Sequence, residues 1–231
     1  MKSVGKRINF DIIYTKYKNR GKGNVRLTQS NLFLTQPIDA TKSAYTFKVL
    51  ENDSIGLQPN EIRLNLNDEF IITAMQISLV GTQSQTLDGK TVATTQILTY
   101  APIELDGQAI KVKGLYAGKF KIAVNNIVYM EKWAVRKHEF IPQTQIASFI
   151  GGVPVATQPN IDYSQDGIIA IEPMLTLSGA KKNELLIELP EAIAPTTLSF
   201  IDQKGNEILW NVDRIGITLF GLNGQNAALF Q

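Results

Sequence analysis

Short stretches in which apolar and polar residues alternate recur along most of the chain. Residues 46–50, 120–124 and 197–201 show this period of two, and Gly, Pro, Asn and Asp separate such stretches from one another. A period of two predicts strands with one buried face, because successive side chains of a strand point to opposite sides of the sheet. Many short strands between turn residues, with almost no helical pattern, predict an all-β sandwich or jelly roll.

Turn residues predict where these strands reverse direction. Asp88-Gly89 indicates a hairpin or a long loop, and Asn125-Asn126 indicates a tight turn between two strands. Residues 109–113 also alternate and are interpreted as a strand. Residues 131–140 fit either a helix or a strand, and we expect a strand or an irregular edge there.

One motif occurs twice in the chain. Residues 60–66 read NEIRLNL and residues 183–189 read NELLIEL, so both have the form Asn-Glu-apolar-x-apolar-x-Leu. In the same register Thr73 aligns with Thr196, and Met75 aligns with Leu198. The match predicts a duplication, that is, two copies of one β domain. Coincidence is the alternative, since β-rich chains offer many such partial matches.

An uncharged stretch divides the chain into two parts. Residues 141–159 contain Gly151-Gly152, Pro154 and Pro159 and no charged residue, which is typical of a connection. We therefore predict a basic N-terminal arm at residues 1–26 and a first jelly roll at residues 27–142. A connection at residues 143–159 and a second jelly roll at residues 160–231 complete the predicted organisation.

Composition limits the class of protein. The 231 residues suffice for one large β domain or two domains of about 100 residues. The absence of Cys excludes disulfides and thiol chemistry, and it fits a reducing cytoplasm. No apolar run reaches the roughly 18 residues of a membrane span, and the first residues lack the apolar region of a secretory signal. We expect a soluble chain that is not secreted by itself.

Positive charge is concentrated in the first 26 residues. They hold eight bases and one acid, Asp11, a net charge of +7, whereas the other 15 bases and 20 acids give −5. The eight bases are Lys2, Lys6, Arg7, Lys16, Lys18, Arg20, Lys22 and Arg26. We interpret them as the contact with phosphate groups, either on anionic lipid headgroups or on nucleic acid. The alternative is a basic terminus that only adds solubility.

The arm is expected to be exposed and flexible. Residues 8–15 alternate as a short strand would, and residues 16–24 show no period. Tyr14 and Tyr17 lie beside the bases, where aromatic rings can rest on lipid headgroups or stack on nucleobases.

The sequence carries no signature of catalysis. His138 is the only histidine and no Gly-x-Ser-x-Gly motif occurs, which disfavours a Ser-His-Asp triad. One histidine and no cysteine exclude a metal site built on such ligands, and we expect a partly exposed or interface histidine. A glycosidase needs two carboxylates, for which Glu61, Glu184 and Glu188 are candidates, but alternation places most of them on a solvated face.

Two further motifs bear on ion or phosphate binding. Residues 160–167 resemble the first half of a calcium loop through Asp162 and Asp166. Counted from Asp162 as the first position, the twelfth position is Pro173, where a calcium loop has a Glu. An Asp-Gly turn is favoured there, and calcium binding near Asp162 and Asp166 stays open. A phosphate-binding Gly-rich loop is absent. We predict no enzyme activity, no catalytic or metal-ligating residue, no cofactor and no small-molecule substrate.

Four features together resemble the double jelly-roll major capsid proteins of tailless icosahedral viruses, in particular small bacteriophages with an internal membrane. They are the duplication at residues 60–66 and 183–189, the uncharged connection, the basic arm and the lack of an active site. The resemblance is architectural and covers the whole chain. It implies two tandem eight-stranded jelly-roll β-barrels.

The resemblance also implies how the chain assembles. Three copies would form a trimer whose six barrels make a pseudo-hexagonal capsomer of an icosahedral shell, with other virion proteins as partners. The arm would face the internal membrane or the genome. The protein would be part of the virion after assembly in the host cytoplasm.

Three other functions remain open. A single-jelly-roll virion protein, such as a penton or spike, would have two halves that are not equivalent. A carbohydrate-binding β-sandwich would display aromatic side chains, for which Trp133 and Trp210 give a weak signal. A nucleic-acid-binding protein would fit the arm but not the acidic remainder of the chain.

Overall fold

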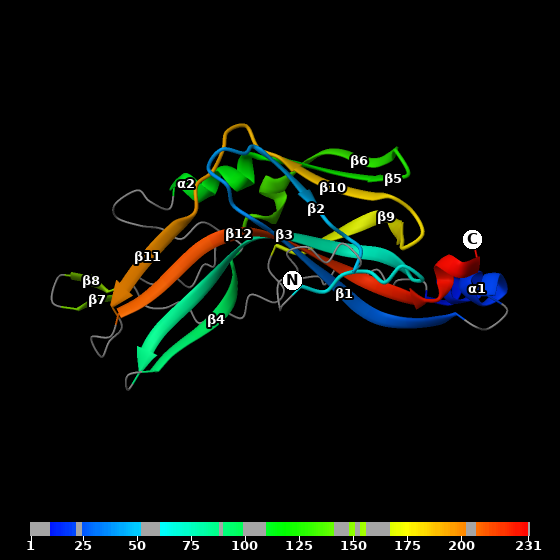
Figure 1. The fold of residues 1–231 in the computed structure, drawn as a ribbon, viewed down its shortest axis with the longest axis horizontal. Helices are drawn as coiled ribbons and strands as arrows, with labels where there is room; N and C mark the ends of the chain where they lie inside the picture. Colours follow the sequence, from blue (N-terminus) through cyan, green and yellow to red (C-terminus); the bar gives the residue numbers. More distant parts are fainter. Residues whose placement is uncertain are drawn as a thin grey trace.

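Strands dominate the described part of the chain (Figure 1). The computed structural model describes residues 10–21, 25–51, 61–87, 90–98, 110–140, 148–150, 153–155, 167–201 and 207–230. The strands are β1 (Arg26–Pro37), β2 (Ala44–Phe47), β3 (Glu69–Leu87), β4 (Lys90–Leu98), β5 (Lys119–Val124), β6 (Ile127–Ala134), β7 (Ser148–Ile150), β8 (Val153–Val155), β9 (Ile169–Ser178), β10 (Asn183–Glu188), β11 (Thr196–Ile201) and β12 (Glu207–Gln225). The helices are α1 (Phe10–Gly21), α2 (Ile110–Lys113) and the 3-10 helices η1 (Gly114–Ala117), η2 (Val135–His138) and η3 (Ala227–Phe230). The prediction of a mostly β chain is confirmed.

The larger sheet is built around β3 and β12, which pair antiparallel over most of their 19 residues each. On the outer side of β12, β11 pairs with its first part and β1 with its second part. On the outer side of β3, β9 pairs with the first part and β4 with the second part. Within the described residues this gives a six-stranded antiparallel sheet.

A smaller sheet packs against the larger one. Its four described strands have the order β2-β10-β5-β6 and are antiparallel throughout. Buried apolar residues from both sheets form one core cluster between them. A separate hairpin of β7 and β8 completes the described strands.

Eight of these strands have the connectivity of a jelly roll. In chain order they are β1, β2, β3, β5, β6, β9, β10 and β12. The first pairs with the last, and the pattern continues inward as β2 with β10, β3 with β9 and β5 with β6. These four pairs of antiparallel strands continue one another and wrap around the core. Each of the two sheets contains four of the eight strands. The hairpins to β4 and β11 extend one end of the larger sheet.

Strands from both expected barrels pair with one another. β1 and β3, from residues 27–142, pair with β12, and β2 and β5 pair with β10. Buried residues from both parts share the core cluster. The double jelly roll is therefore not confirmed: the described strands form one open sandwich of two sheets, without a closed barrel.

The alternating pattern selects the core side chains. Ile217 of β12 lies opposite Leu34 of β1 on one side and Ile77 of β3 on the other, and all three are buried. In β10, Leu185 and Ile187 are buried in the same way. Each such side chain contributes about 1.5–3 kcal/mol through removal of apolar surface from water.

The sequence repeat does not correspond to a structural repeat. Residues 61–66 form an irregular segment with isolated bridges to Phe33 and Leu50, whereas residues 183–188 form the inner strand β10. Thr73 lies in the central strand β3, but Thr196 begins the peripheral strand β11. The two copies occupy different places in the sandwich, so the match reflects only a shared alternation.

Local turns follow the sequence more closely. Asn125 and Asn126 have positive φ angles of 49° and 65° and join β5 to β6, which confirms the predicted tight turn. The antiparallel ladder of β3 and β4 ends with the pair Leu87 and Lys90, which confirms that these two strands form a hairpin, while Asp88 and Gly89 lie outside the described residues.

Two segments next to these turns depart from the predicted strands. The strand expected at residues 109–113 is wrong over 110–113, because Val112 and Leu115 reach the core from one face of consecutive helical turns. In residues 131–140 the strand ends at Ala134 and a 3-10 helix follows.

Candidate functional site

Helix α1 contains most of the described part of the basic arm. The expected strand-like pattern of residues 8–15 and the expected flexibility of residues 16–24 are both wrong over residues 10–21, which form a 12-residue helix. Ile13 and Tyr17 lie on the same face of this helix because they are four residues apart, and both are buried. Packing of this face overrides the alternation seen in the sequence.

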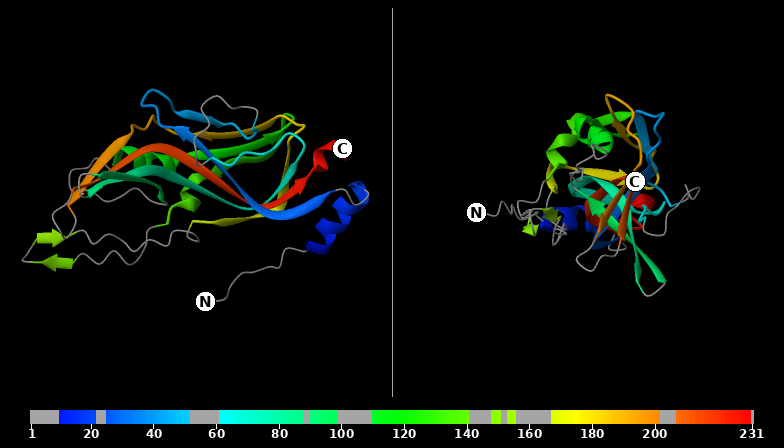
Figure 2. Two further views of the ribbon diagram at one scale, coloured as in Figure 1. Left: turned by 60° about the horizontal axis from the view of Figure 1, so that its bottom comes forward. Right: turned by 90° about the vertical axis from the view of Figure 1, so that its left-hand side faces the viewer.

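The buried face of α1 covers the outer surface of the larger sheet. Ile13 and Tyr17 form a second apolar cluster with Val25, Ile71, Leu222 and Ala227. Ile71 lies between Phe70 and Ile72, which face the main core, so the cluster lies on the opposite side of the sheet. Figure 1 and the left view of Figure 2 show α1 beside the C-terminal segment, at the end of β12.

Gly224 of β12 lies at the contact between this cluster and the C-terminal 3-10 helix. A Cβ atom added at Gly224 would lie at an ordinary van der Waals distance of 3.5 Å from Tyr17 Cε1 but only 3.2 Å from Ala227 Cβ. The glycine therefore relieves crowding against η3, and the tyrosine ring does not depend on it.

Tyr17 also joins the helix to the start of β3 through a polar contact. Its hydroxyl donates a hydrogen bond of 2.7 Å to Glu69 Oε2, and the Glu69 side chain is buried. Hydrogen bonds to charged groups typically contribute about 1.5–3 kcal/mol. The position of α1 is thus fixed by an apolar contact and a buried polar one.

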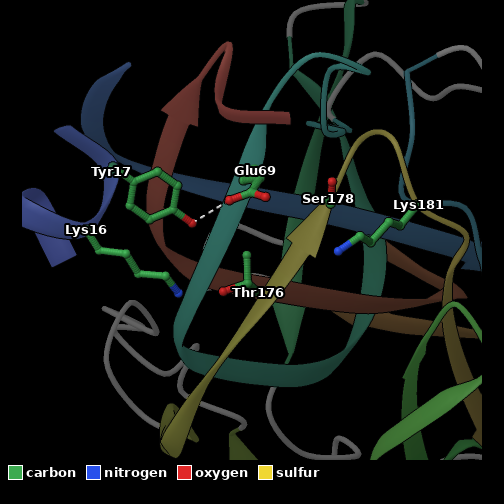
Figure 3. A pocket seen from close by; sticks show the side chains of 6 residues that line it. All are labelled: Lys16, Tyr17, Glu69, Thr176, Ser178 and Lys181. Carbon is green, nitrogen blue, oxygen red and sulfur yellow. Dashed lines mark hydrogen bonds between the residues drawn. The ribbon is translucent and has the colours of Figure 1, made fainter. Parts of the chain in front are cut away.

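A polar pocket of about 190 Å³ lies between the helix and the sheet. It is lined by Lys16, Tyr17, Glu69, Thr176, Ser178 and Lys181 (Figure 3). Lys16 and Lys181 lie on opposite sides of it, and Glu69 and Ser178 are buried. Its volume is below the 300–1,000 Å³ usual for small-molecule sites. We interpret this pocket as the junction of helix and sheet.

The structure brings only part of the predicted basic set together. Lys16 and Lys18 are exposed on α1, and Lys18 Nζ lies 6.0 Å from the centre of the exposed Tyr14 ring. Arg26 is exposed at the first position of β1. Arg20 belongs to α1, whereas Lys2, Lys6, Arg7 and Lys22 lie outside the described residues.

Lys181 is a further basic residue of this region, and the sequence alone does not place it there. It comes from the turn between β9 and β10 and lines the same pocket as Lys16. The pair Lys181-Lys182 was the available signal, but the pairing of β9 with the start of β3 is what places it near the arm.

His138 is fully buried within the chain, so the expectation of a partly exposed or interface histidine is wrong. Trp133 Nε1 donates a hydrogen bond of 3.1 Å to His138 Nε2, and His138 Nδ1 lies 2.9 Å from the Gly167 carbonyl oxygen. Burial lowers the pKa of His138 from 6.5 to about 4, although the Gly167 carbonyl acts in the opposite direction. A neutral imidazole with its hydrogen on Nδ1 satisfies both contacts and ties η2 to the start of β9.

The candidate carboxylates have structural partners. Glu61 Oε1 accepts hydrogen bonds from Thr35 N and Oγ1 at 2.8 and 2.7 Å, and its Oε2 lies 2.8 Å from Arg63 Nη2. The Glu61 side chain is buried, contrary to the expected solvated face. Glu184 Oε1 lies 3.4 Å from Lys121 Nζ, and Glu188 is exposed as expected.

The described residues show neither a metal-binding cluster nor a membrane-spanning helix. They contain no group of three or more His, Asp or Glu side chains that could hold a metal ion. The calcium-like segment with Asp162 and Asp166 lies outside the described residues. None of the described helices is long and apolar enough to cross a bilayer.

No protein-family model, no curated protein and no solved structure matches this chain. A functional proposal therefore rests on the fold and on the surfaces that it presents.

Proposed function

We propose that this chain is a shell-forming structural protein of a virus particle, in which each copy supplies one jelly-roll sandwich. The observation that carries the proposal is the pairing of eight strands, first with last and inward, in two facing sheets. This connectivity is widespread in capsid proteins, though lectins and cupins share it. The fold alone therefore does not separate a capsid protein from a lectin or a cupin, and the exposed side chains have to decide between them.

The fixed basic helix favours a shell protein. Lys16 and Lys18 are exposed on a helix that Ile13 and Tyr17 hold against the sheet. A positively charged helix face that is fixed in position can bind an extended anionic layer, such as lipid headgroups or a packaged genome. Each base near an anionic leaflet contributes about 1 kcal/mol, and salt weakens the attraction.

The pseudo-hexagonal trimer expected from a double jelly roll needs two sandwiches in each chain. One sandwich in the described residues supports the simpler form, in which each copy contributes a single jelly roll to the shell. Penton and major capsid roles both fit that form, and we favour the major shell protein because the basic face suits a repeated inner lining.

Carbohydrate binding is less well supported. Such sites display aromatic rings to solvent, but the Trp133 ring is half-buried and lies 3.9 Å below Lys137 Nζ. Its N–H is engaged by His138.

The proposal is tested with the purified full-length chain by sedimentation and electron microscopy. We expect concentration-dependent assembly into closed particles or their capsomers. A chain that remains monomeric under all salt and pH conditions would contradict the shell role.

The anionic layer is tested separately with the double variant Lys16→Glu/Lys18→Glu. Flotation with phosphatidylserine vesicles and gel shift with a single-stranded oligonucleotide distinguish lipid from nucleic acid. We expect the variant to lose most of the binding to one of these probes, and added salt to weaken wild-type binding. Lys113→Glu/Lys119→Glu, with the same change in charge at exposed positions of α2 and β5, is the matched control. Equal binding by the two double variants would refute the role of α1.

A further inference from the structure

Two lysine side chains point into the polar pocket between α1 and the larger sheet from opposite sides. Figure 3 shows the Lys16 ammonium group coming from α1 and the Lys181 ammonium group coming from the turn after β9, with Thr176 between them. No ion pair within the described part of the chain engages either ammonium group. Two such cations that converge on one polar pocket favour an anionic ligand, and lysine binds phosphate as a point charge.

The turn that carries Lys181 is fixed by hydrogen bonds. Asn183 Nδ2 donates to the carbonyl oxygens of Ser178 and Lys181 at 2.8 and 3.0 Å. Gly179 N donates to the Asp68 carbonyl oxygen at 2.8 Å, which attaches the turn to the residue before β3. A preorganised backbone loses little conformational entropy when a ligand binds.

Helix α1 fixes the position of the other cation. Lys16 is exposed and directly precedes Tyr17, whose ring is buried and whose hydroxyl donates to Glu69 Oε2 at 2.7 Å. The helix backbone therefore holds Lys16 at the rim of the pocket, so both cations belong to parts of the fold that are attached to β3.

The charge of the pocket matches a phosphodiester. Its lining carries two cations, Lys16 and Lys181, and one carboxylate, Glu69, so its net charge is +1. Together α1, residues 67–69 and residues 179–182 hold five bases and three acids, a net charge of +2. A phosphodiester carries one negative charge, whereas a phosphate monoester carries about −1.5 to −2 at pH 7. The buried carboxylate of Glu69 therefore favours the singly charged diester.

The size of the pocket favours a lipid headgroup over nucleic acid. Its volume of about 190 Å³ is small for a drug-sized ligand but suits one phosphate group with a small alcohol attached. A nucleic acid has a bulky nucleoside on both ester oxygens, whereas a phospholipid has a small alcohol on one of them. The buried Tyr17 ring is the only aromatic ring that lines the pocket, so it offers no open face on which a base could stack.

We propose that this pocket binds the phosphodiester group of a phospholipid headgroup. The ammonium groups of Lys16 and Lys181 are its cationic contacts, and the Thr176 hydroxyl is a hydrogen-bond donor. The inference rests on the proposed contact of α1 with an anionic layer, and it replaces a diffuse attraction by one headgroup site in each chain.

Glycerophosphoglycerol, the soluble headgroup of phosphatidylglycerol, tests the site without a membrane. Phosphorus NMR of this probe, titrated with the full-length chain, should show saturable binding to one site per chain. Lys16→Gln and Lys181→Gln each remove a charged contact and should weaken binding at least about tenfold. Thr176→Val removes one hydroxyl and should weaken it about threefold.

Two neighbouring lysines provide matched controls. Lys18→Gln and Lys182→Gln remove the same charge from the same helix and the same turn, at residues that do not line the pocket. A diffuse attraction would be weakened equally by all four substitutions, whereas a defined site is weakened mainly by those at Lys16 and Lys181. Circular dichroism checks folding, and Lys181→Arg, which keeps the charge, should bind more tightly than Lys181→Gln.

Three further probes identify the source of the phosphate group. Inorganic phosphate should bind more weakly than glycerophosphoglycerol, and equal or tighter binding would replace the lipid by free phosphate. Flotation with phosphatidylglycerol vesicles should fall more for Lys16→Gln than for Lys18→Gln. A single-stranded oligonucleotide should bind these two variants equally, and a larger loss for Lys16→Gln with this probe alone would assign the pocket to nucleic acid.

The outcomes separate this site from the proposed function. If the wild-type chain does not bind the soluble headgroup, or if all four Lys→Gln variants bind it alike, the site is wrong, and assembly of the wild-type chain into particles still supports the shell role. Saturable headgroup binding that depends on Lys16 and Lys181, by a chain that never assembles, would support the site and overturn the shell role.

Discussion

Trp133 and His138 are joined by a hydrogen bond in which the indole N–H donates to a neutral imidazole nitrogen. The other ring nitrogen of His138 faces the Gly167 carbonyl oxygen. A second proton would have to sit on His138 Nε2, where it meets the Trp133 N–H. Acid is therefore expected to break the hydrogen bond between Trp133 of β6 and His138 of η2, whereas the contact of Nδ1 with the Gly167 carbonyl persists.

The pH dependence of stability follows from this link. The pKa of His138 falls from 6.5 to about 4 on folding, so the unfolded chain binds more protons between these values. The contribution of His138 to the free energy of unfolding should be constant above pH 6.5 and be lost as the pH falls toward 4, by up to about 3 kcal/mol. Urea unfolding at a series of pH values measures this slope.

His138→Gln is the control for that slope. It removes the titrating group, so the stability of the variant should fall less than that of the wild type between pH 6.5 and pH 4, and the difference between the two slopes is the contribution of His138. The Asp39 carboxyl does not interfere, because the side-chain hydrogen bond from Thr41 lowers its pKa to about 2. Its contribution is present above pH 3.8 and is lost as the pH falls through 2. An unchanged slope in His138→Gln would rule out the proposed link.

Tyr17→Phe tests how α1 is held. The substitution removes the hydrogen bond to Glu69 and keeps the ring, so we expect a loss of about 1–3 kcal/mol in the free energy of unfolding. Hydrogen exchange should show faster opening of α1 than of β3. Tyr14→Phe changes an exposed hydroxyl on the same helix and should be neutral. If both variants behave alike, the contact with Glu69 does not hold the helix.

Gly221→Ala tests the close approach of β12 to β3. A Cβ at this position would overlap the Ile71 carbonyl oxygen, at a register shift between Phe220 and Gly221. We expect severe destabilisation, of at least about 4 kcal/mol, seen as a large drop in Tm. Gly224→Ala, whose nearest contact would be 3.2 Å, should cost much less. Comparable Tm values for the two variants would contradict this geometry.

Asn126→Ala tests the turn that joins β5 to β6. Asn126 has a positive φ of 65°, a conformation that costs most residues about 1–2 kcal/mol. Asn126→Gly should preserve or raise stability, whereas Asn126→Ala should lower it by about 1 kcal/mol. Thermal unfolding of both variants decides whether the turn is formed as described.

The sequence predicts local β structure well because alternation and turn residues act over a few positions. The Asn125-Asn126 turn and the hairpin after Leu87 are examples. It does not predict which strands pair. Leu34 and Ile217 lie opposite each other in neighbouring strands, but nothing in the residues around either one specifies the other as its partner. Two tandem domains and one interleaved sandwich therefore look alike in the pattern of strands.

The candidate site divides in the same way. Concentrated charge identifies Lys16 and Lys18 without any structure. The helix that carries them depends on Leu222 and Ala227, which lie some 200 residues away in the chain. Similarly, Lys181 joins the site only through strand pairing. What the sequence lacks is the distant packing that decides between strand and helix in residues 10–21.

The placement of β12 has a consequence for how the protein is made. This strand lies between β1 and β3, so the larger sheet has a gap until residues 207–225 have left the ribosome. Its contacts join positions far apart in the chain, which slows folding and delays it until synthesis is nearly complete. An incomplete chain would lack the strand that unites the sheet, and only finished copies would be competent to associate.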